Sequence, residues 1–191
     1  MRPAFLTRSA VTVAAAALLV AAAPRAYAPA TVVLVVRHAE RAPGTGDVPL
    51  SAEGEARARA LAELGRAAGV DAIITTQYLR ARQTAAPLAT ALNLTPEVVA
   101  AQGDVEAHAR AVANAVRQRP AGSTVLVVGH SNTVAPIVAA LGGARHRELC
   151  DSEYDAIFLV VLDDEGPVRT VKSRFGASTP VGTTCAPMRQ G

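Results

Sequence analysis

The sequence is poor in cysteine and in aromatic residues. Its 191 residues include two cysteines, no tryptophan and only 3% aromatic residues. Two cysteines are too few for a disulfide-rich scaffold, and neither lies in a C-x-x-C or other metal-ligand spacing. With 50% hydrophobic and 18% charged residues, the composition is that of a globular protein. We therefore expect one domain whose core is built mainly from valine, leucine, isoleucine and alanine.

The sequence also lacks a patch of basic residues interleaved with aromatics, which is typical of nucleic-acid binding. The formal net charge of +3 comes from residues 1–28, which contain three arginines and no acidic residue. Residues 29–191 contain 16 basic and 16 acidic residues. This balance of charge indicates no nucleic-acid partner.

A hydrophobic run long enough to cross a membrane is missing as well. The uncharged stretch at 9–24 has 16 residues, whereas a membrane-spanning helix needs about 20. Two arginines precede this stretch, and Ala26-Tyr27-Ala28 follows it with the small-x-small pattern of a cleavage site. We therefore predict a signal peptide at residues 1–28, a single domain at residues 29–191, and a periplasmic or secreted protein. No stable membrane anchor is expected after cleavage, and the exact scissile bond is left open.

The two cysteines, Cys150 and Cys185, fit export because neither has the spacing of a metal ligand. In an oxidising compartment, one disulfide between them is the simple expectation. On the chain-entropy model it would stabilise the fold by about 4 kcal/mol. Two buried free thiols are the alternative.

Two valine-rich runs end in histidine. Thr31–Val36 leads into Arg37 and His38, and residues 124–128 lead into Gly129 and His130. Short, unbroken, β-branched runs are typical of strands buried on both faces of a parallel sheet. Ligands bind at the carboxyl ends of such strands. If the two strands are parallel neighbours, His38 and His130 meet at one rim.

The remaining pattern alternates helices and strands and ends in a hairpin. It predicts an α/β fold, a three-layer α/β/α sandwich with a mixed, mostly parallel central sheet. Helices are expected at 51–69, 79–92, 104–119 and 133–141, and further strands at 71–76, 97–100, 156–162 and 168–174.

The rim can bind an anion. Guanidinium groups such as those of Arg37 and of Arg80 or Arg82 bind phosphoryl oxygens bidentately, and helix N-termini add backbone N–H donors. A neutral imidazole in such a pocket can attack phosphorus through one ring nitrogen while a hydrogen bond holds the other. A metal site on His38 and His130 is disfavoured, because no third ligand has a matching spacing and the arginines would repel a cation.

Three polar motifs carry a family resemblance: R-H-A-E at 37–40, L-R-A-R-Q-T at 79–84 and V-V-G-H-S-N at 127–132. In this order and spacing they closely resemble the histidine phosphatase superfamily, which includes the phosphoglycerate mutases. The chain looks most like its small phosphohistidine-phosphatase branch. The resemblance covers roughly residues 31–175. It implies an α/β/α sandwich and activity without a metal or other cofactor.

The resemblance also implies roles for single residues. His38 corresponds to the histidine that becomes phosphohistidine, and Arg37 to the first phosphate-binding arginine. The second phosphate-binding arginine is Arg80 rather than Arg82, which we expect either at the surface or just behind the residues that contact phosphate. His130 corresponds to the histidine that contacts the phosphoryl group and stabilises the transition state.

Other polar residues have two interpretations each. Asp104 is the best candidate for the acid that protonates the leaving oxygen, and Glu106 is the second, but a helix-cap role explains Asp104 equally well. In the small branch such an acid is not evident. Ser131 either offers a backbone N–H to phosphate or caps a helix. Glu40 either assists at the rim or orients Arg37 or a backbone amide.

We therefore expect an exported phosphatase that hydrolyses a small phosphomonoester through a phosphohistidine on His38. The alternatives are a phosphohistidine or phosphoprotein phosphatase and a non-catalytic exported phosphate-binding module. A mutase is less expected, because no sizeable lid insertion separates Arg80 from His130. His108 and His146, which lie in polar segments, are expected to be solvated.

Overall fold

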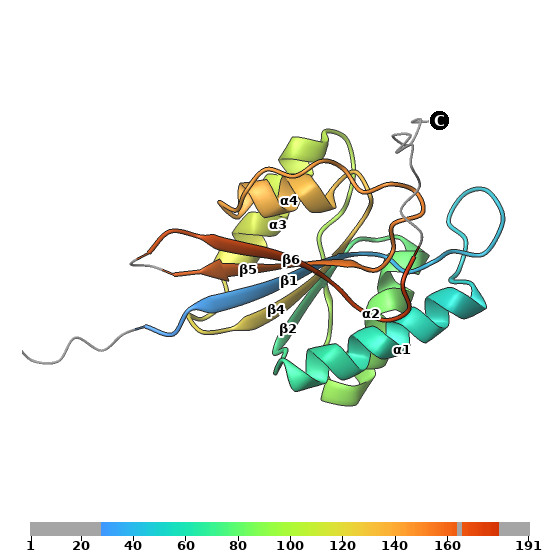
Figure 1. Ribbon diagram of the computed structural model, residues 1–191, viewed down its shortest axis with the longest axis horizontal. Helices are drawn as coiled ribbons and strands as arrows, with labels where there is room; N and C mark the ends of the chain where they lie inside the picture. Colours follow the sequence, from blue (N-terminus) through green and yellow to red (C-terminus); the bar gives the residue numbers. More distant parts are fainter. Residues whose placement is uncertain (1–27, 164–165, 180–191) are drawn as a thin grey trace, which may run out of the picture.

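The valine-rich run that ends in Arg37 forms strand β1 near the middle of a six-stranded sheet (Figure 1). The computed structural model describes residues 28–163 and 166–179. The strand order is β3-β2-β4-β1-β5-β6. Strands β1 to β4 are parallel, β5 is antiparallel to them, and β6 pairs antiparallel with β5 and so runs in the direction of β1 to β4. The predicted mixed, mostly parallel sheet is therefore confirmed.

Every expected element is present, and no boundary differs from its expected position by more than two residues. The strands are β1 (Thr31–Arg37), β2 (Ala72–Thr75), β3 (Glu97–Val98), β4 (Thr124–Gly129), β5 (Ala156–Leu162) and β6 (Arg169–Arg174). The helices are α1 (Ala52–Ala67), α2 (Leu79–Leu92), α3 (Val105–Arg117) and α4 (Val134–Ala140).

The helices cover the two faces of the sheet, with α1 and α2 on one face and α3 and α4 on the other (Figure 1). Successive side chains of a strand point to opposite faces, and β1 shows this directly. Leu34 and Val36 pack in the cluster that includes α1 and α2 residues, whereas Val33 and Val35 pack in the cluster with α3 and α4. All four are at most 1% exposed, so β1 is the common centre of both hydrophobic cores.

The ends of three neighbouring strands meet at one edge of this sheet. In the parallel pair of β1 and β4, Arg37 lies opposite Gly129, and the backbone N–H of His38 donates to the carbonyl of Gly129 at 2.9 Å. Because β5 is antiparallel to β1, its first residues lie at the same edge, with Ile157 opposite Val36. The loop before β5 therefore reaches the rim that carries His38.

Two predictions concern residues that the structure does not describe. The predicted signal peptide falls almost wholly on residues 1–27, and Cys185 lies in the undescribed C-terminal segment. Cys150 is buried in the loop before β5. Export and the disulfide therefore stay predictions. Within the described ranges, no helix is both long and apolar enough to cross a membrane.

Candidate active site

The rim carries a cavity of about 330 Å³. Its lining comes from the end of β1 and the loop after it, the start of α2, and the loop before β5. The lining residues are Arg37, His38, Arg41, Gly46, Arg80, Asp151 and Tyr154. Three arginines against one aspartate make this cavity suited to an anion.

His38 is held as a neutral nucleophile. Its Nδ1 lies 2.8 Å from the carbonyl oxygen of Ala39, and a carbonyl only accepts hydrogen bonds, so Nδ1 carries the proton. The lone pair is therefore on Nε2. Burial lowers the pKa of His38 to about 2, and the positive charge of Arg37 acts in the same direction. The imidazole is uncharged at neutral pH.

Arg37 is buried, and the loop before β5 surrounds it. One of its terminal nitrogens donates to the carbonyls of Cys150 and Asp151, both at 2.9 Å. The guanidinium also lies over the Tyr154 ring, 4.0 Å from the ring centroid. Burial lowers its pKa, while the charges of Tyr154 and Asp151 oppose this. Its Nε is buried without a hydrogen-bond partner among the described residues, so one donor is left for a ligand.

Arg80 reaches the cavity from the first turn of α2. The Asp47 carboxylate accepts hydrogen bonds from the backbone N–H of Leu79 at 2.8 and 3.0 Å, and lies 3.5 Å from the Arg80 guanidinium. Arg80 also lies 4.4 Å from the Tyr78 ring centroid. Its Nε, like that of Arg37, is buried and has no partner in the described part of the chain. Arg82 is exposed, as its register predicts.

His130 lies directly beside His38, with 5.3 Å between the ring centroids. Its Nε2 is 3.0 Å from the Thr76 hydroxyl oxygen. Burial lowers the pKa of His130 to about 3, with Arg80 as the largest contribution from nearby charge. The two histidines therefore meet as the parallel strands predict, although His130 is not among the residues that line the cavity.

Ser131 follows His130 and is 2% exposed. Its hydroxyl oxygen has no hydrogen-bond partner within the described ranges, and it does not line the cavity. The first turn of α4 is instead tied by Thr133, whose hydroxyl oxygen accepts from the backbone N–H of His130 at 2.8 Å. A capping role for Ser131 is therefore not what the structure shows.

Asp104 takes the helix-cap position. Its carboxylate accepts from the backbone N–H of Ala107 at 2.9 Å at the start of α3. Asp104 and Glu106 are both exposed, and neither lines the cavity. The structure thus supports the cap interpretation of Asp104 and gives no contact that supports its role as the acid.

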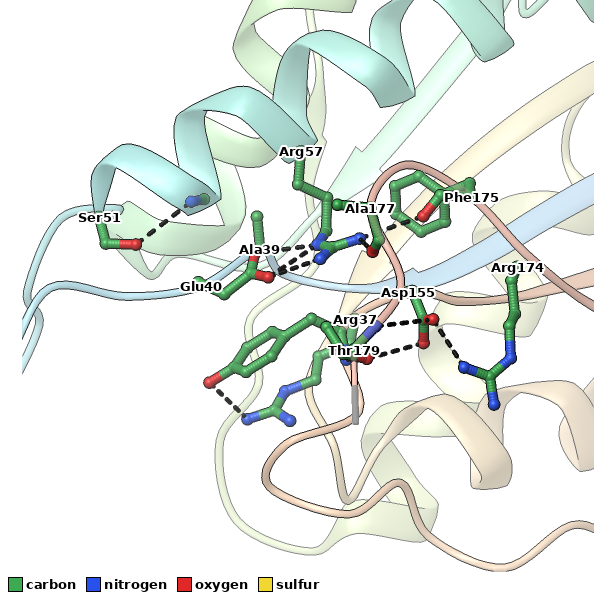
Figure 2. A network of polar contacts seen from close by, with 12 residues as sticks. Arg37, Ala39, Glu40, Ser51, Arg57, Asp155, Arg174, Phe175, Ala177 and Thr179 are labelled. Carbon is green, nitrogen blue, oxygen red and sulfur yellow. Dashed lines mark hydrogen bonds and ion pairs between the residues drawn. The ribbon is translucent and has the colours of Figure 1, made fainter. Parts of the chain in front are cut away.

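The structure corrects two expectations for other polar residues. Glu40 neither enters the cavity nor bonds to Arg37; its carboxylate accepts three hydrogen bonds from Arg57, at 2.6 to 3.0 Å (Figure 2). His108 is 5% exposed rather than solvated, because α3 turns it to the core, where its Nδ1 lies 3.1 Å from the carbonyl of Ala100. His146 is half-buried against the Phe158 ring.

Sequence reasoning missed four residues of this site: Arg41, Asp47, Asp151 and Tyr154. Two of them precede β5. The predicted hairpin at the end of the chain was the available clue, because an antiparallel strand beside β1 must begin at the rim where β1 ends. Two of the chain's three tyrosines lie against the site's arginines, which is notable in a sequence with 3% aromatic residues.

The described residues contain no group of three or more histidine, cysteine, aspartate or glutamate side chains that could hold a metal ion. The polar groups that line the cavity are mostly hydrogen-bond donors with positive charge. What they can do chemically is bind a tetrahedral oxyanion next to a neutral imidazole nitrogen.

Comparisons with known proteins bear on the family and the fold of the chain. Residues 33–103 match the model of the histidine phosphatase superfamily (branch 1), a range that includes His38 and Arg80. No match was found among the curated proteins.

Several solved structures share the fold. The protein histidine phosphatase SixA in complex with tungstate is 25% identical, with a TM-score of 0.59 over 75% of this chain and 96% of that chain. The putative phosphohistidine phosphatase SixA from Nakamurella multipartitia is 20% identical, with a TM-score of 0.57 over 79% of this chain and 99% of that one. The mycobacterial glucosyl-3-phosphoglycerate phosphatase is 20% identical, with a TM-score of 0.56 over 77% and 99%. In sequence over residues 33–103 and in the fold of its sheet and helices, the chain thus resembles the histidine phosphatase superfamily, as its three polar motifs predict.

Proposed function

We propose that the chain is a phosphatase that hydrolyses a small phosphomonoester through a phosphohistidine on His38. The observation that carries this proposal is the state of the His38 ring. Its proton is fixed on Nδ1 by the Ala39 carbonyl, so Nε2 has a lone pair at a cavity lined by arginines. Arg37 and Arg80 each keep a buried Nε that no described residue satisfies, and the oxygens of a phosphoryl group would satisfy both.

The reaction takes two steps. In the first, Nε2 of His38 forms a bond to phosphorus while the bond from phosphorus to the ester oxygen breaks, and the leaving oxygen takes the electron pair and a proton from solvent. In the second, water attacks the phosphohistidine, the N–P bond breaks, and its electrons return to Nε2. The attacking water gives its proton to solvent. The arginines and, in this proposal, His130 stabilise the charge on the transferred group.

The comparisons support the same chemistry. Tungstate, which the related SixA structure contains, is a tetrahedral oxyanion like phosphate. Two of the similar structures are named as histidine or phosphohistidine phosphatases, and a third as a sugar-phosphoglycerate phosphatase. All of them exceed a TM-score of 0.5 over at least three quarters of this chain.

A phosphohistidine or phosphoprotein substrate is the second candidate. It is favoured by the position of Asp104 and Glu106, which lie on the exposed start of α3 and not in the cavity. A nitrogen leaving group needs less help from an acid than an alkoxide does. The only carboxylate in the described cavity lining is that of Asp151, which lies 3.7 Å from Arg37.

The decisive experiment combines turnover with trapping of the intermediate. The purified chain should hydrolyse p-nitrophenyl phosphate in the presence of EDTA and should be inhibited by vanadate. Rapid acid-free quenching with a labelled substrate should give an acid-labile, base-stable phosphate on His38. The variant His38→Ala should show no label and no turnover above background, because His38 is the only histidine among the described residues that line the cavity. A label on another residue, or full activity of His38→Ala, would contradict the mechanism.

We further propose that the phosphatase acts outside the cytoplasm, on the basis of the leader pattern at residues 1–28 and the lone cysteine pair. Mass measurement of secreted protein, alkylated with and without reductant, tests both points. A mass that retains the leader, or two cysteines alkylated without reductant, would count against the proposal.

A further inference from the structure

The position of Arg37 depends on a loop distant in sequence. Its guanidinium donates to the carbonyls of Cys150 and Asp151, and its other terminal nitrogen lies 3.3 Å from the Tyr154 hydroxyl. The guanidinium carbon of Arg37 also lies over the Tyr154 ring, 4.0 Å from the ring centroid. Every described hydrogen bond of this side chain therefore goes to residues 150–154, and the orientation of its free Nε is set by that loop.

The loop is in turn anchored by Asp155, whose side chain is 1% exposed (Figure 2). Its Oδ1 accepts from the Thr179 hydroxyl at 2.9 Å, and its Oδ2 accepts from the Thr179 backbone N–H at 3.1 Å and from Arg174 at 2.7 Å. Burial by itself raises the pKa of Asp155, but these hydrogen bonds outweigh it and lower the pKa below its ordinary value. The carboxylate is therefore ionised and accepts all three bonds.

Thr179 connects Asp155 to Tyr154 through hydrogen bonds. Because the Thr179 hydroxyl donates its one proton to Asp155, its oxygen can only accept from other partners. It accepts from the backbone N–H of Tyr154 at 3.3 Å. Contacts thus run without interruption from Asp155 through Thr179 and Tyr154 to Arg37.

We propose that Asp155 and Thr179 are positioning residues for phosphate binding, which fix the Tyr154 backbone and thereby hold Arg37 in its anion-binding orientation. This rests on the proposed function of the cavity. The competing explanation is that Asp155 and Thr179 only fasten the segment after β6 to the domain. That explanation predicts a loss of stability without a change in phosphate affinity.

The test compares three threonine variants of the full chain. Thr179→Val removes the hydroxyl at nearly constant volume, and Thr179→Ser keeps it. Thr170→Val is the matched control, because the Thr170 hydroxyl accepts from a backbone N–H, that of Ala144, away from the cavity. We measure the Kd of inorganic phosphate by calorimetry and the stability of each variant by urea unfolding. Thr179→Val should weaken phosphate binding about fivefold, as expected for one lost hydrogen bond, with Thr179→Ser and Thr170→Val close to wild type.

A pair of Tyr154 variants tests the contact between Tyr154 and Arg37. Tyr154→Phe keeps the ring over Arg37, whereas Tyr154→Leu removes it. Tyr154→Leu should raise the Kd of phosphate about tenfold, and Tyr154→Phe should raise it by about twofold or less. If Thr179→Val does not fold, the Tyr154 variants provide the test. Equal phosphate Kd values for Tyr154→Leu and Tyr154→Phe overturn the proposal, because Thr179 could then not act on Arg37 through Tyr154.

The outcomes separate this inference from the proposed function. A wild-type chain that binds phosphate without turning over substrate contradicts the phosphatase, while the Thr179 and Tyr154 comparisons still test the positioning. A wild-type chain that turns over substrate, with the same phosphate Kd in Thr179→Val, overturns the positioning alone. A wild-type chain that does not bind phosphate overturns both.

Discussion

Three arginines line the cavity, but they are not equivalent. Arg37 and Arg80 each hold a buried Nε that no described residue satisfies, whereas Arg41 is exposed and donates to the carbonyl of Gly44. A buried donor without a partner costs free energy, and a bound oxyanion removes that cost. In the proposed function, the buried Nε donors of Arg37 and Arg80 are therefore where a phosphoryl group would be bound most strongly.

This difference predicts the effect of two neighbouring substitutions. Arg80→Gln should lower kcat/KM by about 10²- to 10³-fold, because it removes a charged donor from the transferred group. Arg82→Gln, two positions along the same helix, should change kcat/KM by less than about threefold, because Arg82 is exposed and does not line the cavity. Steady-state kinetics on the two purified variants checks this. Equal losses would show that the register of the L-R-A-R-Q-T motif is misassigned.

At the scale of single elements, helix α1 is fitted tightly against the chain that follows β1. The Ser51 side chain caps the helix by accepting from the backbone N–H of Gly54 at 3.2 Å (Figure 2). The backbone N–H of Ser51 donates to the carbonyl of Glu40, and Arg57 from the next turn pairs with the Glu40 carboxylate. A Cβ on Gly54 would lie 2.0 Å from the Glu40 carbonyl oxygen. The start of α1 therefore fixes the backbone at Glu40, two residues after His38.

Gly54→Ala should consequently destabilise the protein, although alanine in a helix interior normally stabilises by about 1 kcal/mol relative to glycine. We expect a net loss of about 1–3 kcal/mol in urea unfolding, together with reduced turnover, because the clash is with backbone. Gly65→Ala is the comparison in the same helix, since the three atoms nearest its new Cβ belong to the Leu88 side chain and not to backbone. A stability of Gly54→Ala at or above wild type would contradict the tight fit described here.

The elements themselves were predictable, and the contacts between them were not. Valine runs, caps such as Ser51 and Asp104, and the break at Asn93 mark local conformation, which the chain encodes locally. The placement of His38 beside His130 also followed, because parallel strands align their ends. The role of Tyr154 did not, since it depends on an antiparallel strand more than a hundred residues after Arg37.

The expectations for Glu40 and His108 were wrong for the same reason, since both depend on contacts between elements. The pairing of Glu40 with Arg57 requires the end of β1 and the second turn of α1 to meet, and no periodicity in the sequence encodes that distance. The burial of His108 requires knowing which face of α3 meets the sheet. Both features depend on how the helices pack against the sheet. The polar residues that surround Glu40 and His108 in the sequence instead suggest exposed positions.

At the scale of the whole molecule, the fold buries histidines in their neutral form. His38, His108 and His130 are each at most 5% exposed, and burial is the main cause that lowers the pKa of each. An unfolded chain would bind protons at these residues from about pH 6.5 downward, whereas in the folded chain their lowered pKa values move proton binding to lower pH. Below that pH, protons therefore favour the unfolded state.

The contribution of these histidines to the free energy of unfolding should thus be greatest above about pH 6.5. It should fall as the pH decreases toward the folded pKa values, about 2 for His38 and about 3 for His130. Each histidine contributes a slope of up to about 1.4 kcal/mol per pH unit. Urea unfolding at about pH 7.5, 6 and 5 in phosphate-free buffer measures this slope. The double variant His38→Asn/His130→Asn should show a flatter profile, and an unchanged slope would contradict the assigned neutral state.

The position of β1 within the sheet also affects the order in which the chain can fold. Its neighbours are β4 and β5, so the first strand to be synthesised must wait until residue 162 before both of its partners exist. Contacts of such long sequence separation form slowly. During synthesis, and during the translocation that we propose, residues 31–37 therefore leave the ribosome long before they can join a sheet. If the chain is exported as we propose, this order of synthesis would delay folding of the central strand until most of the chain has been made, and the hydrophobic run at 31–37 would remain unpaired in the interval.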